Sequence, residues 1–302
     1  MKNIQQWIDD LNAGDIRSIA KALSAVENKS EHSQELLKAL PFKKNVPIVG
    51  ITGPPGAGKS SVVNACIHEL LKKDKKVAIL AVDPSSPFNY GSLLGDRVRM
   101  DSHFSNDNVF IRSVASRGHL GGLSTRIYEM ADVLKNAHFD YIFIETVGVG
   151  QSEVEIAGIA DITAVVLVPE AGDEIQTMKS GVMEIANLFV VNKSDRDGAQ
   201  AYTQNLLKLV HTLAHEVPVV NTTAIKNEGI NLLIEKIENL QNQTINTERK
   251  VHLLANRAWQ LLSSKHMEVY EYKFLLAELR DLQKQTNFNL YRYINDIYDK
   301  HS

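Results

Sequence analysis

Short apolar runs recur through the middle of the chain and alternate with longer segments in which apolar residues follow helical spacing. The runs are almost continuously apolar, whereas a strand with one face in water would alternate apolar and polar residues. Strands buried on both faces are typical of a parallel sheet covered by helices on each side. The pattern therefore predicts an α/β fold with a doubly wound, mostly parallel sheet. The predicted strands are residues 46–51, 77–82, 109–111, 141–144, 164–168, 188–191 and 217–220.

Both ends of the chain lack this alternation. Apolar residues from Ile4 to Leu23 follow helical spacing, with a polar, glycine-containing break at 12–15. Beyond about residue 240 the strand pattern stops, the polar residues 241–244 predict a linker, and helical spacing resumes at Val251. We therefore predict an N-terminal helical extension over 1–45, an α/β domain over 46–240 and a helical arm over 241–302.

The loop after the first predicted strand has the spacing of a phosphate-binding loop: Gly53-Pro54-Pro55-Gly56-Ala57-Gly58-Lys59-Ser60. Glycines let several backbone N–H groups turn toward one phosphate, because no Cβ atom stands in the way. Lys59 adds a positive charge at the β- and γ-phosphates, and the Ser60 hydroxyl is suited to Mg²⁺. Residues 61–71 have the helical spacing that this motif requires after it. A nucleoside triphosphate is the expected ligand.

Composition narrows the class of protein. The chain has 302 residues, a formal net charge of -3 and one cysteine, Cys66. This charge gives no electrostatic case for binding nucleic acid or an anionic membrane. One cysteine excludes a disulfide framework within the chain and suits a reducing compartment. With no apolar run long enough to span a bilayer, we expect a cytoplasmic protein with no nucleic-acid or membrane partner.

A second motif follows the predicted strand 188–191. Asn192-Lys193-Ser194-Asp195 has the Asn-Lys-x-Asp order of guanine recognition. The Asp195 carboxylate can accept hydrogen bonds from the guanine N1–H and the N2 amine together. Adenine has no matching pair of donors, so this motif selects GTP over ATP. Asn192 and Lys193 are expected to brace the loop.

Acidic residues follow other predicted strands, where ligands of open α/β sheets bind. Asp83 ends the second strand, Asp96 lies further along, and Glu145 opens a Glu-x-x-Gly motif that ends at Gly148. Carboxylates there can hold Mg²⁺ or its bound water, and Gly148 can give its N–H to the γ-phosphate. The predicted metal ligands are Ser60, Asp83, Asp96 and Glu145. The alternatives are a turn cap for Asp83 and a solvated loop for Asp96.

Together these motifs resemble the Glu-x-x-Gly branch of P-loop GTPases. More closely, the chain is similar to the MeaB and ArgK proteins, GTPase chaperones of adenosylcobalamin-dependent methylmalonyl-CoA mutase. The resemblance runs from roughly residue 10 to 240. It is carried by Gly53 to Ser61, Asp83 to Pro87, Gly95 to Met100, Ser116 to Gly122, Glu145 to Glu153, Gly172 to Gln176 with Lys179, and Asn192 to Asp195.

The resemblance implies a role for each of these positions. It assigns catalysis to Lys59, Asp96, Glu145, Asp173 and Lys179, and places switches near Asp96, after Gly148 and over 173–179. An exposed helix surface is the alternative for Lys179. Ser61 belongs to the phosphate loop. The sequence departs from the family near Thr222-Thr223-Ala224-Ile225, where Ser-Ala-x is commoner. Thr223 keeps the hydroxyl, and the Ala224 N–H can still meet guanine O6.

The expected function is hydrolysis of GTP to GDP and phosphate by a Mg²⁺-dependent switch. Its expected client is an adenosylcobalamin-dependent acyl-CoA mutase, and relatives suggest a homodimer formed through the C-terminal arm. One alternative is an ATP-dependent kinase linked to amino-acid transport, against which the Asn192 to Asp195 motif argues. Another is a metal-insertion GTPase, which usually needs sites rich in cysteine or histidine.

Overall fold

A computed structural model describes most of the N-terminal four-fifths of the chain and scattered positions beyond. The described residues are 3–41, 46–83, 103, 106–115, 126–146, 155–169, 182–211, 216–242, 251, 254–255, 257–259, 261–263, 278–279 and 293. Among the predicted site residues, Asp96, Gly148, Asp173 and Lys179 lie outside the described residues.

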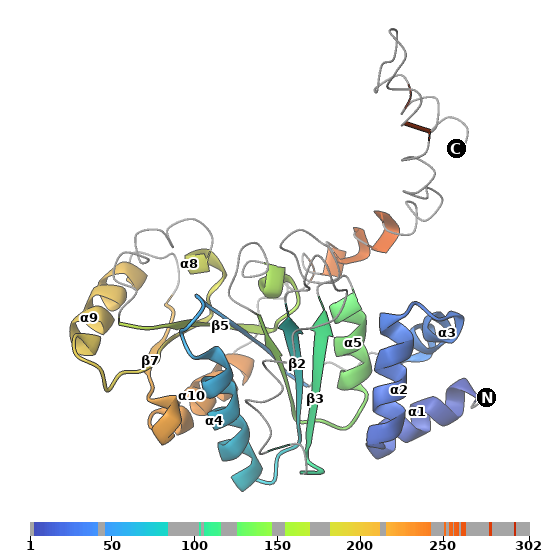
Figure 1. Ribbon diagram of the computed structural model, residues 1–302, viewed down its shortest axis with the longest axis horizontal. Coiled ribbons are helices and arrows are strands. Elements are labelled where there is room, and N and C mark those ends of the chain that lie inside the picture. Colours follow the sequence, from blue (N-terminus) through green and yellow to red (C-terminus); the bar gives the residue numbers. More distant parts are fainter. Residues whose placement is uncertain are drawn as a thin grey trace. The chain divides into compact units, whose positions relative to one another are not determined.

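The described part is built on a seven-stranded sheet in the order β3-β2-β4-β1-β5-β6-β7 (Figure 1). Every pairing between neighbouring strands is parallel. The α/β prediction with a parallel sheet is therefore confirmed. The strands are β1 (Ile48–Thr52), β2 (Val77–Asp83), β3 (Val109–Ala115), β4 (Tyr141–Glu145), β5 (Ile162–Leu167), β6 (Leu188–Val191) and β7 (Val219–Asn221).

Helices cover both faces of the sheet, because side chains of each strand point alternately to opposite sides. Val49 and Ile51 of β1 point to the face packed by α4 (Lys59–Lys72) and α10 (Ile230–Asn242). Ile48 points to the other face, which packs against α5 (Arg126–Lys135). Farther along that face, β5 and β6 pack against α9 (Ala199–Val210), next to the short helix α8 (Val182–Ile185).

The N-terminal residues form three helices, α1 (Ile4–Ala13), α2 (Ile16–Glu27) and α3 (Glu31–Ala39). The predicted break between the first two is a pair of caps. Gly14 ends α1 in the left-handed conformation with φ 76°, and the Asp15 carboxylate accepts from the Ser18 N–H at the start of α2. The sequence pattern did not single out α3, whose buried residues are few.

These helices pack on α5 and share its hydrophobic core. An ion pair fixes α2 to the edge strand, with Arg112 Nη2 2.5 Å from Glu27 Oε2 and both side chains mostly buried. The helical extension over 1–45 therefore lies in the same compact unit as the sheet, Met1–Ile245.

The second compact unit is Asn246–Ser302. The expected linker at 241–244 is wrong at its start, because Gln241 and Asn242 form the end of α10. Burial of Ile234 and Ile237 against the sheet holds this helix together through its polar final turn. Among the described helices, none is long and apolar enough to cross a membrane.

Candidate nucleotide-binding site

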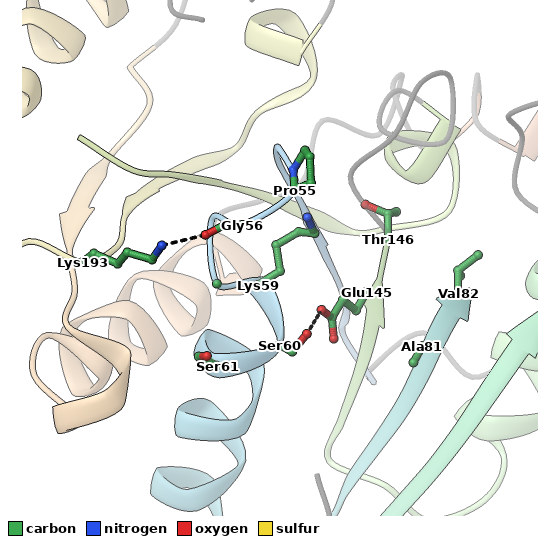
Figure 2. Close-up of a pocket in the computed structure, with 11 residues that line it drawn as sticks. Pro55, Gly56, Lys59, Ser60, Ser61, Ala81, Val82, Glu145, Thr146 and Lys193 are labelled. Atoms are coloured by element: carbon green, nitrogen blue, oxygen red, sulfur yellow. Dashed lines mark hydrogen bonds between the residues drawn. The ribbon is translucent and has the colours of Figure 1, made fainter. Parts of the chain in front are cut away.

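The candidate site lies at the carboxyl edge of the sheet, where the strand order reverses around β1. Because β1, β4 and β6 are parallel, the loops that follow them meet there. A cavity of about 450 Å³ opens between these loops (Figure 2). It is lined by Pro55, Gly56, Gly58, Lys59, Ser60, Ser61, Ala81, Val82, Glu145, Thr146 and Lys193.

The backbone of the phosphate loop requires glycine at two positions. Gly53 has φ 136°, and a Cβ atom there would lie 2.1 Å from the Val166 carbonyl oxygen. Gly58 has φ 84°, and its Cβ atom would lie 2.5 Å from Asn192 Nδ2. Both are conformations that L side chains rarely adopt. The loop thus reaches its shape by close approach to β5 on one side and to Asn192 on the other.

Lys59 is the first residue of α4 and lies 7% exposed beneath the loop. Its Nζ donates to the Gly53 carbonyl oxygen at 2.7 Å and to the Pro54 carbonyl oxygen at 3.0 Å. Figure 2 shows the side chain folded back toward Pro55. These carbonyl contacts hold a buried ammonium at the point where α4 directs its positive N-terminal end into the cavity.

Ser60 and Glu145 meet across the cavity. The Ser60 hydroxyl donates to Glu145 Oε1 at 2.6 Å, and Glu145 is 8% exposed at the end of β4 (Figure 2). The end of β4 is itself fixed to β1, because Thr146 donates its N–H to the Ile51 carbonyl oxygen and its hydroxyl to Thr52 Oγ1. A serine hydroxyl and a carboxylate are oxygen ligands of the kind that Mg²⁺ prefers, so this pair fits that ion.

Asn192 joins the phosphate loop to the two loops after β6 and β7. Its Nδ2 donates to the Ala57 carbonyl oxygen at 2.9 Å. Its Oδ1 accepts from the Ala224 N–H and from the Thr222 hydroxyl, each at 3.2 Å. The side chain is 2% exposed, so both ends of its amide are satisfied inside the protein.

Lys193 and Asp195 lie on the loop after β6. Lys193 has φ 57°, and its Nζ donates to the Gly56 carbonyl oxygen at 2.8 Å. Asp195 Oδ2 lies 3.0 Å from Lys226 Nζ. That hydrogen-bonded ammonium holds the pKa of the Asp195 carboxyl below its ordinary value. A carboxylate that stays ionised accepts hydrogen bonds only, as guanine recognition needs.

The turn after β7 contributes Thr223, Ala224 and Ile225, of which the last two belong to the 3-10 turn η3 (Ala224–Lys226). Thr223 and Ala224 are buried, whereas Ile225 is 81% exposed. A second cavity of about 620 Å³ shares Ser60 and Ser61 with the first and continues along α4 to this turn. The two cavities together connect the phosphate loop with the turn after β7.

Comparison with known proteins agrees with this geometry. The family model described as "Methylmalonyl Co-A mutase-associated GTPase MeaB" matches residues 19–273. The chain belongs to the MeaB family. A Pyrococcus abyssi protein named as a GTPase is 45% identical over 243 residues, which are 78% of this chain and 75% of that protein. The "Methylmalonic aciduria type A homolog, mitochondrial" of Caenorhabditis elegans is 38% identical over 65% of this chain and 53% of that protein.

Among solved structures, one described as "LAO/AO transport system kinase" has a TM-score of 0.70 and 25% sequence identity, covering 99% of each chain. The MeaB resemblance expected from the motifs is thus confirmed, and the enzyme class of the chain is GTPase.

Asp83 is the other predicted metal ligand of this MeaB-family site whose backbone the structure describes. The Asp83 backbone ends β2, which pairs with β4 and so reaches the same edge of the sheet. Asp96, Gly148, Asp173 and Lys179 lie outside the described residues.

Two contributors were missed by sequence reasoning. Lys226 pairs with Asp195, and His103 lines the second cavity. Burial lowers the pKa of His103, and electrostatic interaction with the nearby His68 acts in the same direction. Neither residue belongs to a motif with fixed spacing, so only the three-dimensional arrangement identifies them.

Proposed function

We propose that this MeaB-family GTPase is a Mg²⁺-dependent switch that assembles or protects an adenosylcobalamin-dependent acyl-CoA mutase, such as methylmalonyl-CoA mutase. The family description supports this client, since it names methylmalonyl-CoA mutase. The observation that carries the switch is the contact between Ser60 and Glu145 beside Lys59, because it links the phosphate loop directly to the end of β4, where the Glu-x-x-Gly motif begins.

The proposed reaction is attack of water on the γ-phosphorus of GTP. The bond from that phosphorus to the oxygen bridging the β-phosphate breaks, GDP leaves with the electron pair, and phosphate carries the new P–O bond. Lys59 would stabilise charge on the β- and γ-phosphates, and the N–H groups of the loop would bind their oxygens. Asp195 would accept from the guanine edge.

Ser60 and Glu145 would hold Mg²⁺, together with Asp83 and Asp96. When bound, the ion would supply positive charge next to the phosphate oxygens. Few protein ligands suffice for Mg²⁺, since it usually keeps several waters and is bound through one or two carboxylates and the phosphates. Asp173 and Lys179 keep their proposed catalytic roles in a further switch, whose Lys179 would approach the nucleotide when the client binds. Homodimerisation and a cytoplasmic location are proposed on the sequence alone.

The decisive experiment mixes the purified protein with an adenosylcobalamin-dependent mutase from the same organism. Complex formation and GTP turnover are measured together, with GTP, GDP and no nucleotide. We expect a complex that depends on the nucleotide, and turnover raised by roughly tenfold or more as client binding orders the switches. Lys59→Ala serves as the control that lacks hydrolysis. Absence of a complex in every nucleotide state would contradict the client assignment.

The kinase alternative has one observation in its favour, which is the description of the structural relative as a transport system kinase. It predicts that ATP binds more tightly than GTP and that an acceptor becomes phosphorylated. A direct comparison of ATP and GTP binding separates the two functions.

For metal insertion, the part of the chain that the structure describes offers no group of three or more His, Cys, Asp or Glu side chains placed to hold a metal. Equilibrium dialysis with nickel tests that alternative.

A further inference from the structure

The carboxylate expected to recognise guanine has an ion-pair partner outside both nucleotide-binding motifs. Asp195 Oδ2 lies 3.0 Å from Lys226 Nζ, with side-chain exposures of 32% and 51%. Asp195 belongs to the loop after β6, whereas Lys226 ends η3 after β7. The ion pair therefore connects the two loops between which a guanine base would lie.

We propose that Lys226 is a positioning residue for guanine recognition, which fixes the Asp195 carboxylate so that both its oxygens face the base. The proposal rests on the proposed recognition of guanine by Asp195. It adds a specificity role for a residue that would not itself touch the nucleotide.

The backbone on both sides of the pair is already fixed. Ser194 donates its N–H to the Thr222 carbonyl oxygen at 3.0 Å, and Arg196 donates to the Lys193 carbonyl oxygen at 3.0 Å. The η3 turn is closed by the Lys226 N–H, which donates to the Thr223 carbonyl oxygen at 2.9 Å. The Asp195 carboxylate also accepts from its own backbone N–H. The ion pair to Lys226 at Oδ2 is a further restraint on rotation of this side chain.

Orientation of the carboxylate matters because guanine presents two donors side by side. A carboxylate that accepts two parallel N–H bonds must keep both oxygens in the plane of the base. If it rotates, one contact survives and the other weakens. Each carboxylate oxygen has two lone pairs, so Oδ2 can accept from Lys226 and from the base at the same time.

Other charged groups near the pair are weaker influences. Arg196 also favours the ionised form of Asp195, and Glu228 favours the charged form of Lys226. The hydrogen bond between the two side chains is the largest cause of both shifts: it lowers the pKa of Asp195 and raises the pKa of Lys226. Lys226 is thus the main partner through which the turn after β7 acts on the carboxylate.

A competing account makes Lys226 an obstacle that must leave Asp195 before the base can bind. The two accounts predict opposite changes in nucleotide affinity when Lys226 is removed. Removing a competitor tightens nucleotide binding, whereas removing a positioning group weakens it.

The test compares binding of GDP and inosine diphosphate, which lacks the 2-amino group, to the full-length protein and its Lys226→Met variant. Because exposed ion pairs stabilise weakly, we expect Lys226→Met to lower GDP affinity by about threefold to fivefold. Inosine diphosphate makes one contact to the carboxylate, so its affinity should change less and the preference for GDP should fall. Lys226→Arg should restore the preference. Lys208→Met, which changes an exposed lysine of α9, is the control for loss of a positive charge.

The same measurements in an Asp195→Asn background complete a double-mutant cycle. If Lys226 acts through Asp195, Lys226→Met should then have no further effect. Tighter GDP binding in Lys226→Met, or equal loss for both nucleotides, would overturn the inference. If the unmodified protein itself fails to prefer GDP over inosine diphosphate and ADP, the proposed guanine recognition is wrong instead.

Discussion

Asp195 is the residue whose charge pattern should decide which base binds. Replacing it by asparagine exchanges one acceptor oxygen for an amide N–H donor, which faces the guanine N2 amine unfavourably and the xanthine O2 favourably. We expect Asp195→Asn to lower GTP affinity by about 10- to 100-fold, the loss of one or two hydrogen bonds to a charged group.

Xanthosine triphosphate should bind Asp195→Asn more tightly than GTP does, which competition binding measures. Asp197→Asn changes an exposed acid two residues further along the same loop and should leave the preference for GTP intact. An unchanged base preference in Asp195→Asn would mean that another residue reads the base.

The individual site residues that the sequence predicts are those that belong to motifs with fixed spacing. Lys59 and Ser60 follow their glycines at fixed positions, and Asp195 follows Asn192 by three residues. Lys226 was missed because its partner is 31 positions away in the chain and only the pairing of β6 with β7 brings the two loops together.

The phosphate loop is a single structural element whose shape depends on its contact with β5. Gly53→Ala would place a Cβ atom 2.1 Å from the Val166 carbonyl oxygen in a disfavoured conformation. We expect the free energy of unfolding to fall by more than about 2 kcal/mol. Gly56→Ala is the matched control, since φ is 78° but no atom lies within 4 Å of its Cβ position.

Gly56→Ala should therefore lower the free energy of unfolding only by the cost of a left-handed backbone at alanine, about 1–2 kcal/mol. Urea unfolding without nucleotide compares the two variants and keeps phosphate binding out of the result. Equal losses would show that the contact with Val166 relaxes freely.

The sequence predicted all seven strands, and the differences lie at their ends. β1 and β7 begin later than expected, because Pro47 and Pro218 have no N–H for the sheet. β3 runs on to Ala115 through Arg112 and Ser113, which interrupt the apolar pattern. Arg112 is tolerated on this edge strand because Glu27 of α2 pairs with it. An apolar pattern cannot reveal a charge that is satisfied by a distant helix.

At the scale of the whole molecule, the chain divides after Ile245. Several apolar side chains beyond that point are exposed, among them Trp259 at 73% and Leu262 at 65%. We propose that a second copy of the chain covers them. A chain ending at Ile245 should then be monomeric in light scattering while it still hydrolyses GTP.

A full-length variant carrying Trp259→Gln and Leu262→Gln should also dissociate more readily, so that dilution separates its subunits at a higher protein concentration than in the unmodified protein. Retention of the dimer by the shortened chain would place the interface elsewhere.

The helical spacing after residue 251 predicts an arm. The length of α10 could not be predicted, because its last polar turn is stabilised by contacts made earlier in the helix.

The bonds of Asn192 have a consequence for synthesis of the chain on the ribosome. The phosphate loop leaves the ribosome early, but Asn192, which donates to the Ala57 carbonyl oxygen, follows 135 positions after Ala57. Ala224, which donates its N–H to Asn192, comes later still. A growing chain therefore possesses the glycine-rich segment long before that segment is braced. Nascent chains arrested before residue 192 should fail to retain labelled GDP on a filter, whereas chains released after α10 should retain it. The protein would thus become able to capture its nucleotide only near the end of its own translation.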